Sequence, residues 1–301
     1  AQATKSPDRA TGSKAGEASA PQSPTGNKRP AAFKPEEELE QGAVRGDLTK
    51  VKRALERRAA VGSPNVRGVT PLMLAGSSNG KEALEVLKLL LDKQADVETR
   101  DNNGWRCMHH ACRNGRAEVV RHLLDVKAEP CPMTTDHRTT LMLAVLDGKL
   151  ELIKELIKLK EVRAQVVAKD ALSVSAMHCV AKEGSAEVAK LLLENNGRAN
   201  VVDIEGRTPL AWACQHGKLE CAKALVRASG DIHLRDKTER TPLWHACMNA
   251  SEGVALWLLK KFADPAMQDV AGDSPMMLAV ELGLRKFKKA VEVGTQDEED
   301  A

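Results

Sequence analysis

A short phrase returns at nearly fixed spacing along this chain of 301 residues, and it constrains the fold more than any other feature. Its copies begin at Thr70, Arg106, Thr139, Ser175, Thr208, Thr241 and Ser274. The successive starts are 36, 33, 36, 33, 33 and 33 residues apart. A repeated unit of this length is a small piece of supersecondary structure that can bury its apolar face only against its neighbours. We therefore expect one elongated domain built by stacking similar units.

Each copy of the phrase reads as the start of a helix. The fullest form is Thr70-Pro71-Leu72, in which the Thr hydroxyl can accept a hydrogen bond from the first turn and Pro suits the first helical position. A Gly follows nine residues after the start of most copies, as at Gly115 and Gly148, and can end the helix in the left-handed conformation. A second helix and an Asp-x-x-Gly turn complete the unit. The sequence therefore predicts two helices and one hairpin in each unit.

Several positions depart from this pattern. Gly80 comes ten residues after Thr70, so we expect one extra residue in that first helix. Ala250 stands where Gly is expected, which predicts a less regular helix end. Arg106 replaces the cap hydroxyl, the turn at 134–138 lacks the usual Asp and Gly, and the second helix of the unit starting at Thr139 has an unusual length near 158–161. We expect local irregularity at these places.

The phrase and its period of 33 residues resemble the ankyrin repeat family. The resemblance implies an all-α fold, a solenoid of stacked helix-turn-helix units with projecting hairpin loops. We expect a domain at 36–292 with eight repeats, which start near 37, 70, 106, 139, 175, 208, 241 and 274. The first and last repeats should be caps whose outer faces meet water. Residues 1–35, rich in Ala, Ser, Pro, Gly and Lys, are expected to be disordered, and 293–301 to form an acidic tail.

Composition and motifs argue against several classes of function. The net charge of +3 is too small to indicate nucleic-acid binding by itself, and no apolar run approaches the ~18 residues of a membrane span. The sequence contains no phosphate-binding loop, dinucleotide-binding glycine pattern, zinc-protease motif or nucleophile elbow. We therefore expect no catalysis and no cofactor. Seven Cys without disulfide-like spacing indicate a reducing compartment, cytoplasmic or nuclear.

One cluster could suggest a metal site. Cys107, His109, His110 and Cys112 lie within six residues, and Cys and His are zinc ligands. On one short helix, however, their side chains point in different directions. The family resemblance also implies that His109 and its counterpart His178 form structural hydrogen bonds to the neighbouring repeat. We therefore expect no metal at this cluster.

The family resemblance implies a protein–protein interaction scaffold that binds a partner polypeptide in a concave groove, lined by hairpin tips and by the exposed face of each inner helix. We call residues at the same position of successive repeats a column. By column, the groove candidates are Trp105, His110, Arg113, Asn114, Arg138, Lys182, Arg207, Trp212, Gln215, His216, Arg240 and His245. Further free positions between them include Leu143, Leu172 and Val174.

Two tryptophans are the sharpest hint in this set. Trp105 and Trp212 should be partly exposed, and exposed Trp near Arg is typical of binding hot spots. Trp244 and Trp257 are expected to be packing residues. Basic residues outnumber acidic ones in the groove columns, which suggests a partner with acidic side chains around an apolar anchor.

Alternatives of other classes remain open. The chain could be a regulatory or substrate-recruiting ankyrin segment of a larger enzyme, channel or transferase, since ankyrin stacks often occur in such chains. Nucleic-acid binding is not favoured, because aromatic residues are thinly spread among the basic ones. We expect the stack to be monomeric by itself.

Overall fold

The computed structural model describes residues 34–299, so the predicted disordered segment lies outside the described residues except for Lys34 and Pro35. Within 34–299 the chain forms 17 α-helices and one short 3₁₀ helix. The same residues form no β-strand, only isolated bridges at two hairpins. The predicted all-α class is therefore confirmed. None of the helices in this part of the chain is both long enough and apolar enough to cross a membrane.

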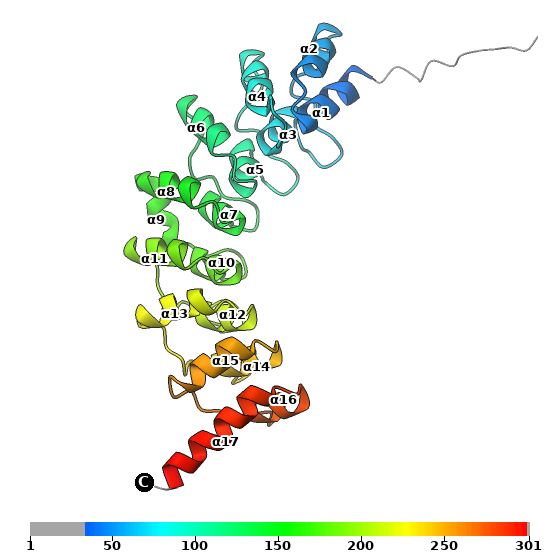
Figure 1. Cartoon of the computed structure of the whole chain (residues 1–301). Helices are drawn as coiled ribbons and strands as arrows, with labels where there is room; N and C mark the ends of the chain where they lie inside the picture. The colour runs from blue at the N-terminus through cyan, green and yellow to red at the C-terminus, as the bar shows by residue number, and fades with distance from the viewer. Residues whose placement is uncertain (1–33, 300–301) are drawn as a thin grey trace, which may run out of the picture. The chain divides into compact units, whose positions relative to one another are not determined.

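The helices form eight consecutive pairs, one for each predicted repeat (Figure 1). The first four pairs are α1 (Pro35–Arg45) with α2 (Leu48–Glu56), α3 (Pro71–Ser77) with α4 (Ala83–Asp92), α5 (Cys107–Arg113) with α6 (Ala117–Asp125) and α7 (Thr140–Asp147) with α8 (Leu150–Lys158). The last four are α10 (Ala176–Glu183) with α11 (Ala186–Glu194), α12 (Pro209–Gln215) with α13 (Leu219–Arg227), α14 (Pro242–Met248) with α15 (Glu252–Leu259) and α16 (Pro275–Glu281) with α17 (Arg285–Glu299). The first helix of each pair, here called the inner helix, packs against the inner helices before and after it.

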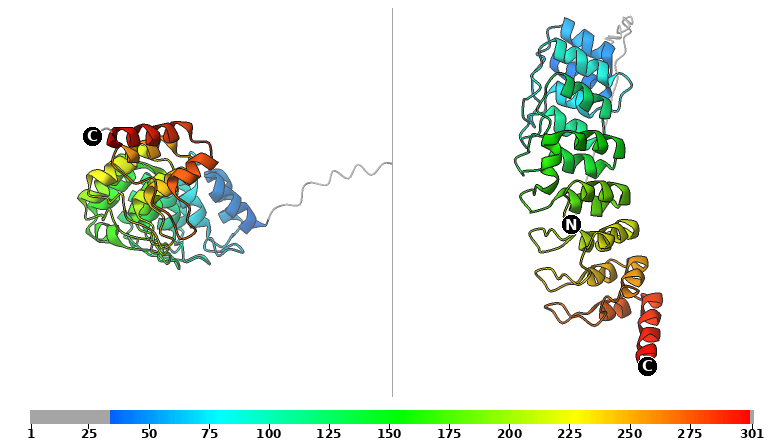
Figure 2. Two further views of the ribbon diagram at one scale, coloured as in Figure 1. Left: turned by 90° about the horizontal axis from the view of Figure 1, so that it is seen from below. Right: turned by 90° about the vertical axis from the view of Figure 1, so that its left-hand side faces the viewer.

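The pairs stack in chain order, and the hairpins project together from one edge of the stack (Figure 2). One contiguous core of Leu, Val, Ala, Met and Cys side chains runs through the seam between the helices. This arrangement is what a repeat that buries its apolar face only against its neighbours requires. It places the inner helices and the hairpins on a common surface.

Helix starts follow the predicted caps. The hydroxyls of Thr70, Thr139, Thr208, Thr241 and Ser274 each accept a hydrogen bond from the backbone N–H three residues on, at 3.2–3.4 Å. Arg106 has no hydroxyl to accept such a bond. Instead, its own backbone N–H donates to Nδ1 of His109, three residues on, at 2.9 Å. The missing hydroxyl therefore leaves no irregularity at this helix start.

Two predictions about helix ends are wrong. Ala250 adopts φ 52°, the same left-handed conformation as Gly217 at φ 67°, so the end of α14 is regular without a glycine. The helix α3 has seven residues, as α5 does, so the extra residue before Gly80 lies in the connection and not in the helix. Gly80 is required there for another reason, because a Cβ at this position would collide with the carbonyl oxygen of Arg45.

Of the two other places where we expected irregular backbone, the turn at 134–138 is regular and the helix near 158–161 is not. In the turn at 134–138 the Thr134 hydroxyl accepts from the backbone N–H of Arg138 at 3.0 Å, and His137 takes the left-handed position at φ 60°. This hairpin therefore keeps the shape of the others, contrary to the expectation of irregularity. The helix near 158–161 is irregular as predicted, because α8 ends at Lys158 and, after Leu159, the chain continues as α9 (Lys160–Ala164) and η1 (Gln165–Val167).

The outer face of the C-terminal repeat, which we predicted to be a cap, carries exposed apolar side chains. Met277 is 52% exposed and Val280 55% exposed, whereas the six preceding repeats bury the residues of these two columns against the next repeat. The helix α17 also continues to Glu299, beyond the predicted boundary at 292. The final repeat therefore ends on an apolar face and a long helix.

Candidate partner-binding groove

Each regular hairpin is organised by one buried carboxylate. In the column formed by Asp101, Asp170, Asp203, Asp236 and Asp269, the Oδ1 atom accepts hydrogen bonds from the backbone N–H groups two and four residues on, at 2.8–3.0 Å. These bonds satisfy the turn's own backbone and fix its shape. The Oδ2 atom of each carboxylate remains available for a second partner.

In three repeats that second partner is a side chain of the following inner helix, nine residues after the Asp. Asp101 Oδ2 lies 3.2 Å from His110 Nε2. Asp203 Oδ2 accepts from Trp212 Nε1 at 2.9 Å. A third pair joins Asp236 Oδ2 to Nε2 of His245 at 2.8 Å.

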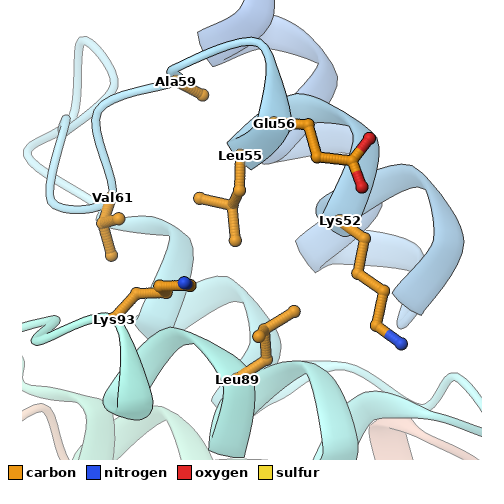
Figure 3. A pocket seen from close by; sticks show the side chains of 7 residues that line it. All are labelled: Lys52, Leu55, Glu56, Ala59, Val61, Leu89 and Lys93. Atoms are coloured by element: carbon orange, nitrogen blue, oxygen red, sulfur yellow. The ribbon is translucent and has the colours of Figure 1, made fainter.

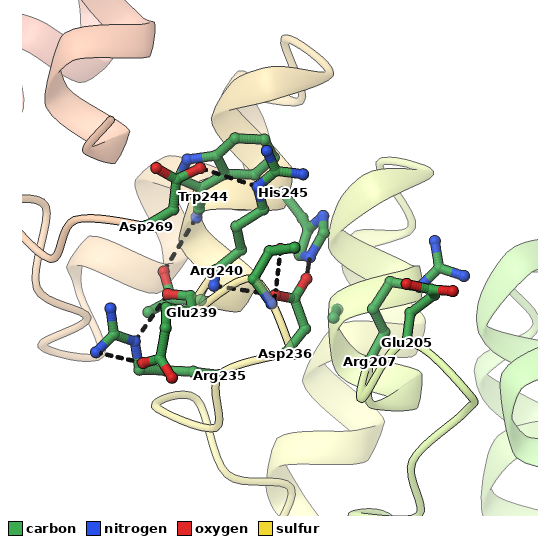
Figure 4. A network of polar contacts seen from close by, with 12 residues as sticks. Glu205, Arg207, Arg235, Asp236, Glu239, Arg240, Trp244, His245 and Asp269 are labelled. Carbon is green, nitrogen blue, oxygen red and sulfur yellow. Dashed lines mark hydrogen bonds and ion pairs between the residues drawn. The ribbon is translucent and has the colours of Figure 1, made fainter. Parts of the chain in front are cut away.

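In two other repeats an Arg of the preceding hairpin reaches the carboxylate instead. Arg138 Nε lies 3.4 Å from Asp170 Oδ2. Arg240 Nε donates to Asp269 Oδ2 at 3.0 Å, as Figure 4 shows. Neither Cys179 nor Leu278, the residues nine positions after these two Asp, can donate strongly to a carboxylate. Each carboxylate therefore positions its hairpin and one groove side chain together.

At Asp203 and Asp236, hydrogen bonds keep the buried carboxylate ionised. Burial alone would raise the pKa of Asp203, but the bonds from Trp212 and from the Arg207 backbone and guanidinium lower it below its usual value. At Asp236 burial is likewise outweighed by hydrogen bonds from His245, Thr238 and Arg240, which lower its pKa. A fixed negative charge thus lies under the groove surface at the hairpins of Asp203 and Asp236.

The two candidate tryptophans are partly exposed, as predicted. The Trp212 ring packs edge-on against His178 at 5.5 Å between ring centroids, and the Arg207 guanidinium lies 5.4 Å from it. The Trp105 ring lies 5.2 Å from His110. Both rings are therefore held in place by neighbours and still offer surface to a partner.

The other two tryptophans pack as predicted. Trp244 is 5% exposed and lies under the Arg240 guanidinium, 3.9 Å from its ring (Figure 4). Trp257 is partly buried against the core.

An apolar hollow of about 160 Å³ lies in the middle of the groove. It is bounded by hairpins and by helices α7, α10 and α12, and its lining residues are Arg138, Met142, Leu146, Asp170, Leu172, Val174, Cys179, Lys182 and Trp212. Burial raises the pKa of the Cys179 thiol to about 12, so this thiol stays protonated and serves as a small apolar wall. The hollow is suited to an apolar side chain, with Lys182 at its rim.

Sequence reasoning found part of this hollow. It named Arg138, Lys182 and Trp212 as candidates, and it placed Leu172 and Val174 among the free positions. Leu146 was missed, although it occupies the same column as Arg113 and Lys182 and could have been found from that register. Leu143 is 1% exposed and belongs to the core, so its placement among the free positions is wrong.

A second, more open hollow of about 380 Å³ lies nearer the N-terminus of the stack. Three of the candidates, Trp105, His110 and Asn114, line it together with Arg67, Val69, Leu74, Ser77, Asp101 and Asn103. The sequence-based set is thus divided between two hollows and the surfaces around them.

The remaining candidates differ in accessibility. Arg113, Lys182 and His216 are exposed, and Gln215 is partly exposed. His245 is only 6% exposed and is held by Asp236, so its placement as an accessible groove residue is wrong.

Fewer basic groove residues are available to a partner than the sequence indicated. Arg138, Arg207 and Arg240 are each paired with a hairpin carboxylate. Within residues 34–299, Arg113 and Lys182 form no ion pair. These two remain as cations that a partner could neutralise.

The Cys and His cluster of α5 is engaged in structural contacts. The Cys107 thiol donates to the carbonyl of Leu72 at 3.4 Å, and Nε2 of His109 bonds the carbonyl of Pro132 at 3.1 Å. Burial lowers the pKa of His109 to about 4, so the ring is neutral at pH 7. In the described part of the chain no group of three or more His, Cys, Asp or Glu is arranged to hold a metal ion.

A further hollow, of about 330 Å³, lies away from the groove between α2 and α4 (Figure 3). Leu55, Val61 and Leu89 form its apolar wall, and Lys52 and Lys93 stand at its edge. No sequence candidate falls there.

Family models place this chain among known repeats. The model for ankyrin repeats in three copies matches residues 39–134 and 141–236, and a model for a single ankyrin repeat matches 238–267. In a solved complex of a predatory endopeptidase with an immunity protein from Bdellovibrio bacteriovorus, one chain matches with a TM-score of 0.55 and 23% identity. The match covers 63% of this chain and 97% of that one, and it supports the fold alone.

Curated relatives match over shorter stretches. Inversin from Mus musculus is 31% identical over 175 residues, which are 58% of this chain and 16% of inversin. A probable E3 ubiquitin-protein ligase from Oryza sativa subsp. japonica is 30% identical, over 55% of this chain and 32% of its own length. Protein phosphatase 1 regulatory subunit 27 from Mus musculus is 37% identical over 85 residues, or 28% of this chain and 53% of that protein.

Proposed function

Because this chain belongs to the ankyrin repeat family, we propose that it is a scaffold that holds a partner polypeptide in its groove and performs no chemistry of its own. Ankyrin repeats are protein–protein interaction modules. The observation that carries the proposal is the apolar hollow among α7, α10 and α12, which leaves Trp212, Leu172 and Leu146 without full cover on an otherwise well packed surface.

The partner's chemistry follows from the hollow and its rim. An apolar side chain of the partner would fill the hollow against Leu172 and Trp212. An acidic side chain beside it would meet Lys182, which is exposed and forms no ion pair in residues 34–299. Because Asp203 already holds Trp212, little ordering cost falls on the scaffold when the partner binds.

Partner capture with matched variants tests the proposal. Full-length chain is immobilised, and a protein retained from source extract is identified and then titrated in purified form. Leu172→Glu and Lys182→Glu should each weaken its binding at least about tenfold, as loss of a central contact does. Lys190→Glu, an exposed charge reversal on the outer helix α11, should bind as the wild type does. Equal affinities for all four proteins, with native helical circular dichroism, would overturn the groove as the binding site.

The relatives favour a second candidate. Those named as a regulatory subunit and as a probable ubiquitin ligase suggest that the stack could recruit a substrate or regulator for chemistry located elsewhere in a longer protein. Full-length transcript sequence distinguishes the candidates, since a reading frame with a catalytic domain beside these repeats would favour recruitment.

A further inference from the structure

Two hollows of the groove lie on one line along the inner helices. The first, lined by Trp105 and His110, lies where α3 meets α5, and the second, lined by Leu172 and Trp212, begins where α7 meets α10. The inner helices pack in chain order (Figure 1), and packed helices lie about 8–10 Å apart. Two such steps put the hollows about 16–20 Å apart. A ligand that fills both must span this distance.

A cation separates the two hollows. Arg113 occupies the same column as Ser77, which lines the first hollow, and Leu146, which lines the second. In chain order it falls between them, and its side chain is exposed. Within residues 34–299 it forms no ion pair, as is also true of Lys182 at the rim of the second hollow. Charge complementarity therefore calls for acidic side chains between the hollows and beside the second one.

Side-chain amides along the groove favour an extended ligand. Asn103 lines the first hollow, and Gln215 lies in the column of Arg113 and Lys182. In the described part of the chain neither amide forms a hydrogen bond. An extended chain has free backbone N–H and C=O groups that these amides can bond, whereas an α-helix satisfies its own.

The spacing of the repeats selects the polyproline II conformation. This conformation advances about 9 Å per turn of three residues, close to the step between inner helices, so every third side chain faces the groove. In a β-strand, side chains three residues apart point to opposite faces. A polyproline II ligand therefore reaches from one hollow to the other in about six residues.

Resting on the proposed function, we propose that the groove binds a proline-rich acidic segment of its partner in the polyproline II conformation. An aromatic side chain fills the larger first hollow against Trp105, and an aliphatic one about six residues away fills the second. An acidic side chain halfway between these two anchors pairs with Arg113, and another beside the second anchor pairs with Lys182.

Fluorescence anisotropy with labelled synthetic peptides tests the spacing. Each peptide carries Phe, a Glu three residues on, and Leu in a proline framework, with Phe and Leu five, six or seven residues apart. The full chain should bind the six-residue spacing at least about tenfold tighter than the others, because a shift of one residue turns Leu about 120° away from its hollow. Equal affinities across the series overturn the proposal. So does tighter binding of a helical peptide whose Phe and Leu span the same distance.

Charge exchange tests the central contact. Arg113→Glu should weaken binding of the six-residue peptide at least about tenfold, and a peptide with Lys in place of its Glu should recover the affinity. Lys190→Glu on the outer helix α11 is the control and should bind as the wild type does. An Arg113→Glu protein that binds both peptides as the wild type does would show that no acidic side chain is recognised there.

Partner capture separates this inference from the proposed function. If no peptide of the series binds while Leu172→Glu still weakens capture of the natural partner, the polyproline II segment is wrong and the groove scaffold stands. If Leu172→Glu and Lys182→Glu leave capture unchanged, the groove itself is wrong.

Discussion

A hairpin Asp and the groove side chain that it holds form one unit in this molecule. Asp203 is the fullest case, because its Oδ1 holds two backbone N–H groups while its Oδ2 receives both Trp212 and Arg207. Hydrogen bonds to a charged acceptor contribute about 1.5–3 kcal/mol each, more than neutral ones. The orientation of the central groove tryptophan therefore depends on a residue that the partner itself would not contact.

Asp203→Asn tests this dependence. The amide oxygen can still accept from Glu205 and Arg207 N–H, but its NH₂ group cannot accept from the Trp212 indole. We expect a loss of about 1–3 kcal/mol in the free energy of unfolding, measured by urea titration. Asp231→Asn is the control, since Asp231 is exposed and its Oδ1 accepts from the backbone of His233, and it should change stability by less than about 0.5 kcal/mol. Equal effects of the two substitutions would contradict the proposed role.

Side-chain accessibility was the part of the site that sequence reasoning predicted least well. The repeat register correctly placed Trp212 and Lys182 on the groove surface. It could not show that His245 turns inward, because that depends on the position of the Asp236 carboxylate. Leu146 was missed because the sequence alone does not distinguish an exposed apolar residue in a groove column from a buried core residue.

Among the elements, helix ends show how far tertiary context overrides a local preference. Ala250 holds a left-handed conformation that costs a non-glycine residue about 1–2 kcal/mol, and the stacked repeats enforce it. The hairpin at 134–138 is similar, with Thr134 in place of Asp and His137 in place of Gly. The spacing of the repeats therefore predicted where the helices and hairpins lie. A residue that departs from the usual one at a helix end or turn, as at Ala250 or His137, did not predict an irregular backbone.

Exchange of residues at two helix ends measures that enforced strain. Ala250→Gly should stabilise the chain by about 0.5–1 kcal/mol, because relief of the left-handed strain exceeds the entropy that glycine adds to the unfolded state. Gly148→Ala should destabilise it by about 1 kcal/mol, and purely through the backbone, since a Cβ there would meet nothing within 4 Å. Chemical denaturation of both variants supplies the measurement. A destabilised Ala250→Gly protein would show that the φ of 52° carries no strain.

For the molecule as a whole, the ends of the stack were harder to predict than its middle. Every internal repeat packs against one similar repeat on each side, so the same alignment of buried and exposed positions describes all six internal repeats. Within residues 34–299, the first and last repeats each pack against one neighbouring repeat, and the residue types of Met277 and Val280 do not differ from those of buried core positions. Only the exposed fractions of the Met277 and Val280 side chains in the structure show that this face is apolar and uncovered.

Buried neutral histidines link the stability of the stack to pH. His109 and His178 each bridge their repeat to the next through Nε2, to the carbonyls of Pro132 and Arg207. Burial lowers the pKa of both rings, to about 4 for His109. The usual value is about 6.5, so between pH 6.5 and 4 the unfolded chain binds protons that the folded chain does not. Stability therefore falls as the solution is acidified through this window.

For His109 alone the loss should approach about 3 kcal/mol by pH 4, because each unit of pKa difference corresponds to about 1.4 kcal/mol. Urea titrations at pH 7, 6, 5 and 4.5 measure it, with His109→Gln as the comparison. The variant should be less stable at pH 7, where it lacks the bridge, and should lose less stability on acidification. The difference between the two proteins should therefore narrow toward pH 4.5. Parallel curves would mean that protonation of His109 does not oppose folding, and that the acid sensitivity arises in the hairpin carboxylates, whose pKa is lowered at Asp203 and Asp236.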